Sequence, residues 1–261
     1  MHTARLTAIA GSAALMFALA CSKGEKAAPQ EGASTPAAGS PAPSSGTEGA
    51  TISGQIKFVG KPPANPPIDM AEEPQCKASY SSPPHEQEVV VNPNGTLADV
   101  FVYVKSGLPE GATYTAPTIP VVIDQKACKY HPRVFGIMVG QPLEIHNSDP
   151  LLHNIKAMGK QNRPFNISQP AAGMTTSRSF TTSEVMVPFE CNVHGWMHAF
   201  AGVLPHPFFS TTGSEGTFMI KGLPAGTYIL QAWHGSYAPE TTTVTVQANE
   251  AKAVDFTFKA Q

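Results

Sequence analysis

Short runs of alternating apolar and polar residues recur along most of this chain, and they constrain its fold more than any other feature. In the first run, ISGQIKF, Ile52, Gly54, Ile56 and Phe58 alternate with polar neighbours. Similar runs are ADVFVYVK, GIMVGQPLEIHN, EVMVPFECN, TYILQAW, TTVTVQ and AVDFTFK. Gly, Pro and Thr separate these runs, and helical periodicity is nearly absent. The pattern predicts an all-β protein made of short strands in a sandwich or barrel.

The first 20 residues have the features of a secretory signal peptide. An apolar run from Leu6 to Ala20 follows Arg5 and is too short to cross a membrane as a helix. Ala18-Leu19-Ala20 before Cys21 resembles a bacterial lipobox, which implies lipidation of Cys21; the alternative is a secreted protein without a lipid. Residues 21–50 are rich in Gly, Ala, Pro and Ser and predict a lipid-anchored flexible linker. We therefore expect an exported lipoprotein that faces the periplasm or the cell surface.

The charge of the chain limits its expected partners, and its length limits the number of domains. The chain has 17 Lys and Arg against 19 Asp and Glu, without a basic block. Nucleic acid is therefore not an expected partner, and the membrane is expected to be contacted only through the lipid anchor. The residues from Thr51 to Gln261 are enough for one large or two small domains.

The stretch PFECNVHGWMHAF, residues 188–200, places Cys191, His194 and Met197 three residues apart. The strand before them puts Cys191 on its apolar face, because alternate residues of a strand share a face. Gly195 interrupts the pattern before a strand resumes, and it disfavours a helix here. The three side chains are thus expected on one loop between two strands, where they can converge on a single point.

A second imidazole is available in PLEIHNSDPLLHNIKA. His146 shares strand parity with Glu144, which favours a solvent-facing position. His153 follows the Asp149-Pro150 turn, and the side-chain amide of Asn154 could brace two loops by hydrogen bonds. We therefore take His153 as the ligand and keep His146 as the alternative.

A thiolate, two imidazoles and a thioether form a specific set of donors. A trigonal Cys-His-His plane with a weak axial Met describes a blue-copper electron-transfer site. Zinc accepts Cys and two His but gains little from Met. The remaining alternative is a buried Cys, a surface His and a core Met that are neighbours by chance.

These residues resemble the cupredoxin family, and the tight ligand spacing is most similar to amicyanin. HPRVFGIMVGQPLEIHNSDPLLHN also resembles the family pattern that precedes the first ligand, and the likeness covers residues 119–205. It implies a Greek-key β-sandwich that holds one type 1 copper ion. The equatorial ligands would be His153, Cys191 and His194, and the axial ligand would be Met197. Gly195 stands where many relatives have Pro.

The same resemblance implies roles for the neighbours of the ligands. Trp196 would either shield the copper or simply pack, and His198 would be a solvated neighbour. An electron carrier of this family docks through an apolar patch around an exposed ligand, which here would be His194 with Gly195, Trp196 and Phe200.

The chain has four Cys, and their uses can be assigned by elimination. Lipidation would use Cys21 and copper would use Cys191. Cys76 and Cys128 would then be free to form a disulfide in an oxidising compartment. Other pairings would use Cys191 and abolish the copper site.

The flanks of this region carry a second resemblance. TISGQIKFVGKPP and TTGSEGTFMIKGLPAGTYILQAWH are similar to carboxypeptidase regulatory-like domains, which are transthyretin-like β-sandwiches without peptidase activity. We expect a smaller sandwich from residues 51–115 and 207–261, with the copper domain, residues 116–206, inserted between them. The alternative is one enlarged sandwich. The Pro-rich segment Lys61–Val89 is expected to wrap the surface, tethered by Cys76.

Three functions follow from these features. The first is a copper protein that carries single electrons between redox protein partners. The second is copper storage or transfer, for which nine scattered Met residues offer no cluster. The third is a non-redox surface scaffold. The sequence contains no His-x-His pair, no Cys-x-x-Cys-His and no phosphate loop, so we do not expect an enzyme.

Overall fold

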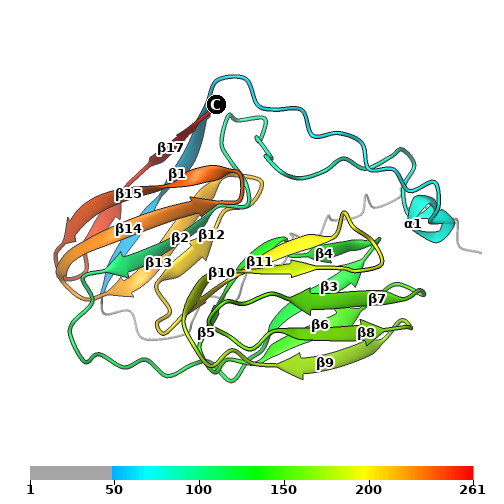
Figure 1. Cartoon of the computed structure of the whole chain (residues 1–261). Helices are drawn as coiled ribbons and strands as arrows, with labels where there is room; N and C mark the ends of the chain where they lie inside the picture. The colour runs from blue at the N-terminus through cyan, green and yellow to red at the C-terminus, as the bar shows by residue number, and fades with distance from the viewer. Residues whose placement is uncertain (1–48, 261) are drawn as a thin grey trace, which may run out of the picture. The chain divides into compact units, whose positions relative to one another are not determined.

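The computed structural model describes residues 49–260 and shows an all-β chain with four sheets (Figure 1). Two of the sheets combine strands from the beginning and the end of this range, and we call them the outer sandwich. One has the order β13 (Thr217–Leu223), β1 (Ala50–Val59), β16 (Ala251–Ala253), with β17 (Phe256–Lys259) also paired to β1. The other has the order β12 (Phe209–Thr211), β2 (Phe101–Ser106), β14 (Gly226–His234), β15 (Tyr237–Val246).

The two remaining sheets use only strands that lie between β2 and β12 in the chain, and we call them the inserted sandwich. The first has the order β5 (Val134–Met138), β11 (His198–Leu204), β10 (Glu184–Glu190), β7 (His153–Ala157), β8 (Phe165–Gln169). The second has the order β4 (Lys129–His131), β3 (Val121–Lys126), β6 (Leu143–Asn147), β9 (Met174–Arg178). The pairs β3–β6 and β5–β11 are parallel, so the chain crosses between the sheets instead of forming only hairpins.

Each sandwich buries its own apolar core. Phe135, Ile145 and Phe189 are fully buried in the inserted sandwich, and Ile52 and Tyr228 are in the outer one. The alternation along the strands produces these cores, because every second side chain points inward. The structure confirms the predicted all-β class.

A smaller cluster packs β2 against β5 and β11 around the ring of Phe101. Gly136 and Gly202 leave room for aromatic rings here. A Cβ atom on Gly202 would lie 2.3 Å from the ring of Phe101, and one on Gly136 would lie 2.3 Å from the ring of Phe209. The two glycines therefore permit this close contact between strands of the two sandwiches.

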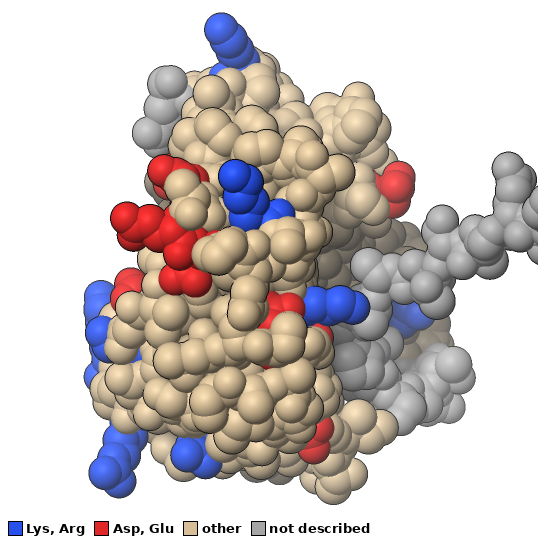
Figure 2. All heavy atoms as spheres, turned by 90° about the vertical axis from the view of Figure 1, so that its right-hand side faces the viewer, with Lys and Arg blue, Asp and Glu red and all other residues tan. Residues whose placement is uncertain are grey.

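The segment between β1 and β2 is mostly irregular and contains one short helix, α1 (Pro74–Ala78). Ile68, Met70 and Cys76 of this segment are buried in the core of the inserted sandwich. The segment thus packs on the inserted sandwich, although it follows a strand of the outer one. Figure 2 turns the side on which α1 lies toward the viewer, and a group of acidic side chains stands out on a largely uncharged surface.

Several sequence predictions concern residues outside the described range. They are the signal peptide over residues 1–20, lipidation of Cys21 and nearly all of the linker. The domain boundaries that we predicted remain predictions. Within residues 49–260 no helix is long and apolar enough to cross a membrane.

Candidate metal centre

Three strands bring His153, Cys191 and His194 together. Strand β10 pairs with β7 on one side and with β11 on the other, with Glu190 opposite Lys156 and His198. Cys191 follows the last residue of β10, His194 lies in the turn toward β11, and His153 is the first residue of β7. The end of β10 therefore delivers Cys191 beside the start of β7.

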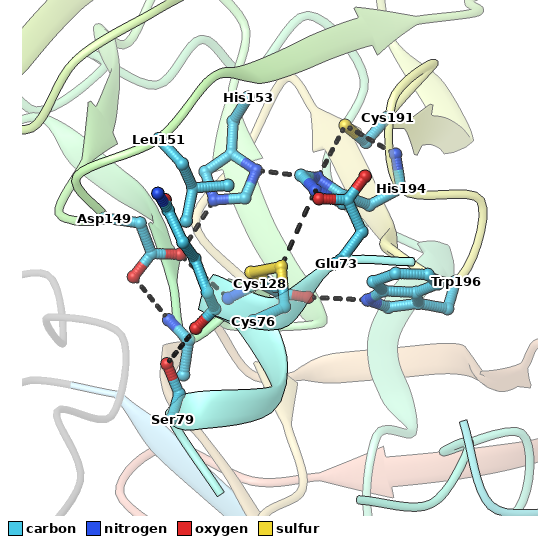
Figure 3. The surroundings of a disulfide bond; sticks show 12 residues. Glu73, Cys76, Ser79, Cys128, Asp149, Leu151, His153, Cys191, His194 and Trp196 are labelled. Carbon is cyan, nitrogen blue, oxygen red and sulfur yellow. Dashed lines mark hydrogen bonds and ion pairs between the residues drawn. A yellow bond between two sulfur atoms is a disulfide. The ribbon is translucent and has the colours of Figure 1, made fainter. Parts of the chain in front are cut away.

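The donor atoms of these three residues face one another (Figure 3). Nδ1 of His153 lies 3.0 Å from Nδ1 of His194, and Sγ of Cys191 lies 3.7 Å from Nδ1 of His194. All three donor atoms lie within 4.8 Å of one another, and all three residues are buried. Two imidazole nitrogens that face each other can share only one proton, whereas both can bind one metal ion.

These distances fit a trigonal metal site. With bonds of about 2.0 Å to imidazole and about 2.3 Å to thiolate, as zinc proteins have, ligand atoms in a trigonal plane lie roughly 3.5 to 3.8 Å apart. The distance from Cys191 to His194 matches this range, and that between the imidazoles is somewhat shorter. Two other donor groups, Cys76-Cys128-His194 and Cys128-Asp149-His153, contain sulfurs bonded in a disulfide, so they offer no thiolate.

The surroundings of Cys191 favour its thiolate. Burial raises the pKa of the thiol, but hydrogen bonds from His153 and His194 outweigh burial and lower the pKa to about 5. Burial lowers the pKa of His153, while hydrogen bonds to Cys191 and Asp149 raise it, and the net shift is upward. At neutral pH, Cys191 is thus in the form that binds soft metals.

The side chain of Asn154 joins the two loops that carry the ligands. Its Oδ1 accepts the backbone N–H of Asn192 at 3.0 Å, and its Nδ2 donates to the carbonyl of Ile167 at 3.2 Å. The backbone N–H of Asn154 also stabilises the thiolate of Cys191. Asn154 therefore makes hydrogen bonds of the kind that the sequence suggested, between the start of β7 and the loop after β10.

Met197 closes the loop that carries Cys191 and His194. Its N–H donates to the carbonyl of His194 at 2.9 Å, and its carbonyl accepts the N–H of Cys191 at 3.2 Å. Its side chain is buried in the core of the inserted sandwich. Its role as the axial ligand remains a prediction.

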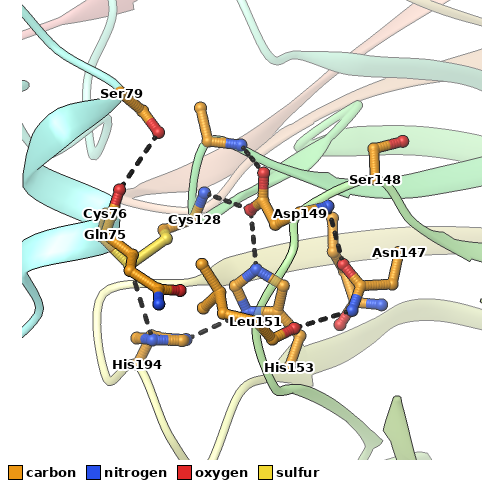
Figure 4. A network of polar contacts seen from close by, with 12 residues as sticks. Gln75, Cys76, Ser79, Cys128, Asn147, Ser148, Asp149, Leu151, His153 and His194 are labelled. Carbon is orange, nitrogen blue, oxygen red and sulfur yellow. Dashed lines mark hydrogen bonds and ion pairs between the residues drawn. A yellow bond between two sulfur atoms is a disulfide. The ribbon is translucent and has the colours of Figure 1, made fainter. Parts of the chain in front are cut away.

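Asp149, which the sequence places in a turn before Pro150, contacts the centre directly (Figure 4). Its Oδ2 accepts from Nε2 of His153 at 2.7 Å and from the N–H of Cys128 at 2.8 Å, and its Oδ1 accepts from the N–H of Ala127 at 2.7 Å. A proton on Nε2 of His153 leaves Nδ1 free to bind a metal. No spacing signal marks this pair, because a separation of four residues brings side chains together in a helix and not in a turn.

A disulfide between Cys76 and Cys128 lies against the other edge of His194. Sγ of Cys76 is 3.6 Å from Nε2 of His194, and a carboxylate oxygen of Glu73 is 3.8 Å from the same nitrogen. His194 is 0% exposed. The expectation of an exposed ligand edge at His194 is therefore wrong, because α1 and the disulfide cover it.

The other candidate residues lie around this centre or away from it. The indole N–H of Trp196 donates to the carbonyl of Cys128 at 2.9 Å, and its ring is 5.3 Å from that of His194. His198 is exposed at the start of β11. His146 is half-exposed, contacts Glu144 at 3.0 Å, and is not among the converging donors of the described residues.

Comparison with known proteins gives one family match, over part of the chain, and several similar solved structures. Residues 206–259 match the family model of the carboxypeptidase regulatory-like domain. No curated protein matches the chain. Among solved structures, a copper-containing nitrite reductase from Thermus scotoductus SA-01 has a TM-score of 0.31 and 22% identity over 38% of this chain, which spans only 25% of that protein.

Two small copper proteins are also similar. A Cu(I) form of an amicyanin variant has a TM-score of 0.29 and 19% identity, over 39% of this chain and 97% of amicyanin. A purple cupredoxin from Nitrosopumilus maritimus has a TM-score of 0.28 and 22% identity, over 31% of this chain and 97% of that protein.

Proposed function

We propose that this chain is a cupredoxin-type copper protein that carries single electrons between redox protein partners. The observation that supports it most is the convergence of Nδ1 of His153, Nδ1 of His194 and Sγ of Cys191 in a buried site. A thiolate with two imidazoles, completed by a weak thioether from Met197, matches a type 1 copper site. Such a copper ion takes up and gives up one electron.

The chain's own residues would keep that exchange fast. Cys191 and His194 are held by a short loop that Met197 closes through two backbone hydrogen bonds. Asn154 ties this loop to the strand that carries His153. Ligands fixed in this way change position little when the charge of the metal changes, so little reorganisation opposes electron transfer.

The signal peptide and Cys21 would place the protein at a membrane as an exported lipoprotein, with the linker as a spacer. We propose no enzymatic activity. Storage or transfer of copper is less favoured, because both His ligands are 0% exposed and Cys191 is 4% exposed, and a transfer site has to present its ligands to a partner.

Redox cycling of the copper-loaded full chain tests the proposal. Ascorbate that supplies one electron per copper ion should reduce the site completely. Ferricyanide should then oxidise the site again, over repeated cycles and without loss of metal. The His153→Ala variant is the matched control, since it lacks one equatorial ligand. Loss of copper within the first cycle would contradict the electron-carrier function and favour storage or transfer.

A further inference from the structure

The segment that covers His194 is fastened by one covalent bond. Cys76 lies in α1, Cys128 lies between β3 and β4, and the two are 52 residues apart in the sequence. Both are 0% exposed, as is His194. The disulfide therefore holds a distant part of the chain directly on the imidazole edge that faces away from Cys191 (Figure 3).

Few other contacts hold this segment in place. Between β1 and β2, the backbone of residues 61–89 forms one isolated bridge to another part of itself, from Pro67 to His85. α1 has five residues and no side-chain hydrogen bond at its N-cap. Within residues 68–80 the remaining anchors are the buried side chains of Ile68 and Met70, the carboxylate of Glu73 near His194, and the hydroxyl of Tyr80, which donates to the carbonyl of Ala127 at 2.6 Å. Side chains of Lys129 and Ser236 hold residues 85–88, outside this part of the segment. Segments with so few ordered contacts open locally at low free-energy cost.

The disulfide is also connected to the second ligand. The N–H of Cys128 donates to the carboxylate of Asp149, which in turn accepts from Nε2 of His153. Ala127 and Cys128 have φ of 51° and 54°, a conformation uncommon for residues other than Gly. Their N–H groups both point to Asp149, so the position of Cys128 affects the side of the centre formed by His153 as well.

We propose that the Cys76–Cys128 disulfide is a clasp on the metal centre, and that its reduction by a dithiol releases α1 and opens the centre to solvent. The inference rests on the proposed function, because it concerns access to that same site. In the step, one thiolate of the dithiol attacks a disulfide sulfur and forms a mixed disulfide. The second thiol of the reductant then closes its own disulfide. Two electrons and two protons pass to Cys76 and Cys128, and the reductant is oxidised.

The clasp predicts a change in the accessibility of Cys191, which can be measured without metal. Alkylation of Cys191 by iodoacetamide would be followed by peptide mass in the metal-free full chain. The double variant Cys76→Ser with Cys128→Ser should react about tenfold faster or more than the oxidised wild type, because the open segment exposes the thiolate. Ser79→Ala is the control, since this exposed side chain contacts only the carbonyl of Gln75 within the same segment. Equal rates in the double variant and the wild type would overturn the proposal.

Hydrogen exchange distinguishes local opening from unfolding. After treatment of the wild type with dithiothreitol, peptides covering residues 68–80 and 191–197 should exchange faster, while β14 and β15 keep their protection. Loss of protection throughout the chain would overturn the clasp, because the disulfide would then hold the whole fold.

Copper binding is measured separately and decides the proposed function. If reduction exposes Cys191 but the oxidised chain binds no copper, the clasp stands and the electron-carrier function falls. If copper binds and the alkylation rate does not respond to reduction, the clasp falls and the function stands.

Discussion

The carboxylate of Asp149 lies 2.7 Å from Nε2 of His153, and both groups are buried. The same carboxylate accepts the N–H groups of Ala127 and Cys128, so one side chain fixes the imidazole and the neighbouring turn together. A carboxylate bonded to a ligand imidazole holds its tautomer and strengthens it as a donor.

Replacing Asp149 by Asn should weaken the centre without removing a ligand. We expect Cu(II) affinity to fall by about 10- to 100-fold. The redox potential should rise, because a poorer imidazole donor stabilises Cu(II) less. Competition with a chelator and a potentiometric titration measure the two effects. Asp124→Asn changes the charge equally at a carboxylate whose hydrogen-bond donor is the hydroxyl of Ser148, and it should leave both values unchanged. Equal effects of the two variants would contradict a specific role of Asp149.

Asn154 and Asn192 offer a second matched pair. Asn154→Ala removes the acceptor that binds the N–H of Asn192, whereas Asn192→Ala keeps that N–H and loses only an exposed side chain. The bond to the N–H of Asn192 is partly buried, and Asn154→Ala also removes the donor to the carbonyl of Ile167, so this variant should lower the free energy of unfolding of the metal-free chain by about 1–3 kcal/mol. Urea unfolding measures the difference. A larger loss for Asn192→Ala would show that the brace is not the Asn154 amide.

The stability of the metal-free chain should depend on pH through Cys191. The pKa of Cys191 is about 5 in the folded chain and ordinarily 9.0, so its stabilising effect is lost as the pH falls toward 5. The pKa of His153 is raised above 6.5, so the stabilisation from His153 is complete below 6.5 and is lost only at higher pH. Between pH 5 and 6.5 the stabilisation from Cys191 should therefore grow with pH.

Urea unfolding at these two pH values, for the wild type and Cys191→Ser, isolates this effect. The difference in free energy of unfolding between the two chains should be larger at the higher pH. A difference that is constant or shrinks would mean that the thiolate is not stabilised by its neighbours.

Two glycines test the packing between strands of the two sandwiches. A Cβ on Gly202 would lie 2.3 Å from the buried ring of Phe101, while a Cβ on Gly195 would meet no atom within 4 Å. Gly202→Ala should therefore destabilise the chain by about 1–3 kcal/mol, and Gly195→Ala should have little effect. Thermal unfolding of both variants provides the measurement. Similar melting temperatures would contradict the close packing at Gly202.

The sequence predicted the features that depend on local patterns. Alternation along ISGQIKF and the other runs predicted the all-β class, because strand periodicity is encoded residue by residue. The short spacing from Cys191 to His194 limited both residues to one loop. The choice of His153 rested on one neighbouring turn and a family pattern, and the structure brings His153 to the other two residues.

The cover over His194 could not be predicted in this way. Cys76 and His194 are 118 residues apart, and the segment 61–89 has no periodicity that indicates where it packs. Its contact with the metal centre depends on which buried positions of the inserted sandwich accept Ile68 and Met70. Asp149 was missed for a related reason: a residue before Pro is typical of a turn, and its bond to His153 depends on how that turn folds.

The absorption spectrum of the full chain loaded with Cu(II), beside Cys191→Ser, tests the central claim most directly. We expect an intense visible thiolate-to-copper charge-transfer band that is absent from Cys191→Ser and is bleached by ascorbate. Tight Cu(II) binding without this band, or a band of equal strength in Cys191→Ser, would contradict a type 1 centre formed by His153, Cys191 and His194.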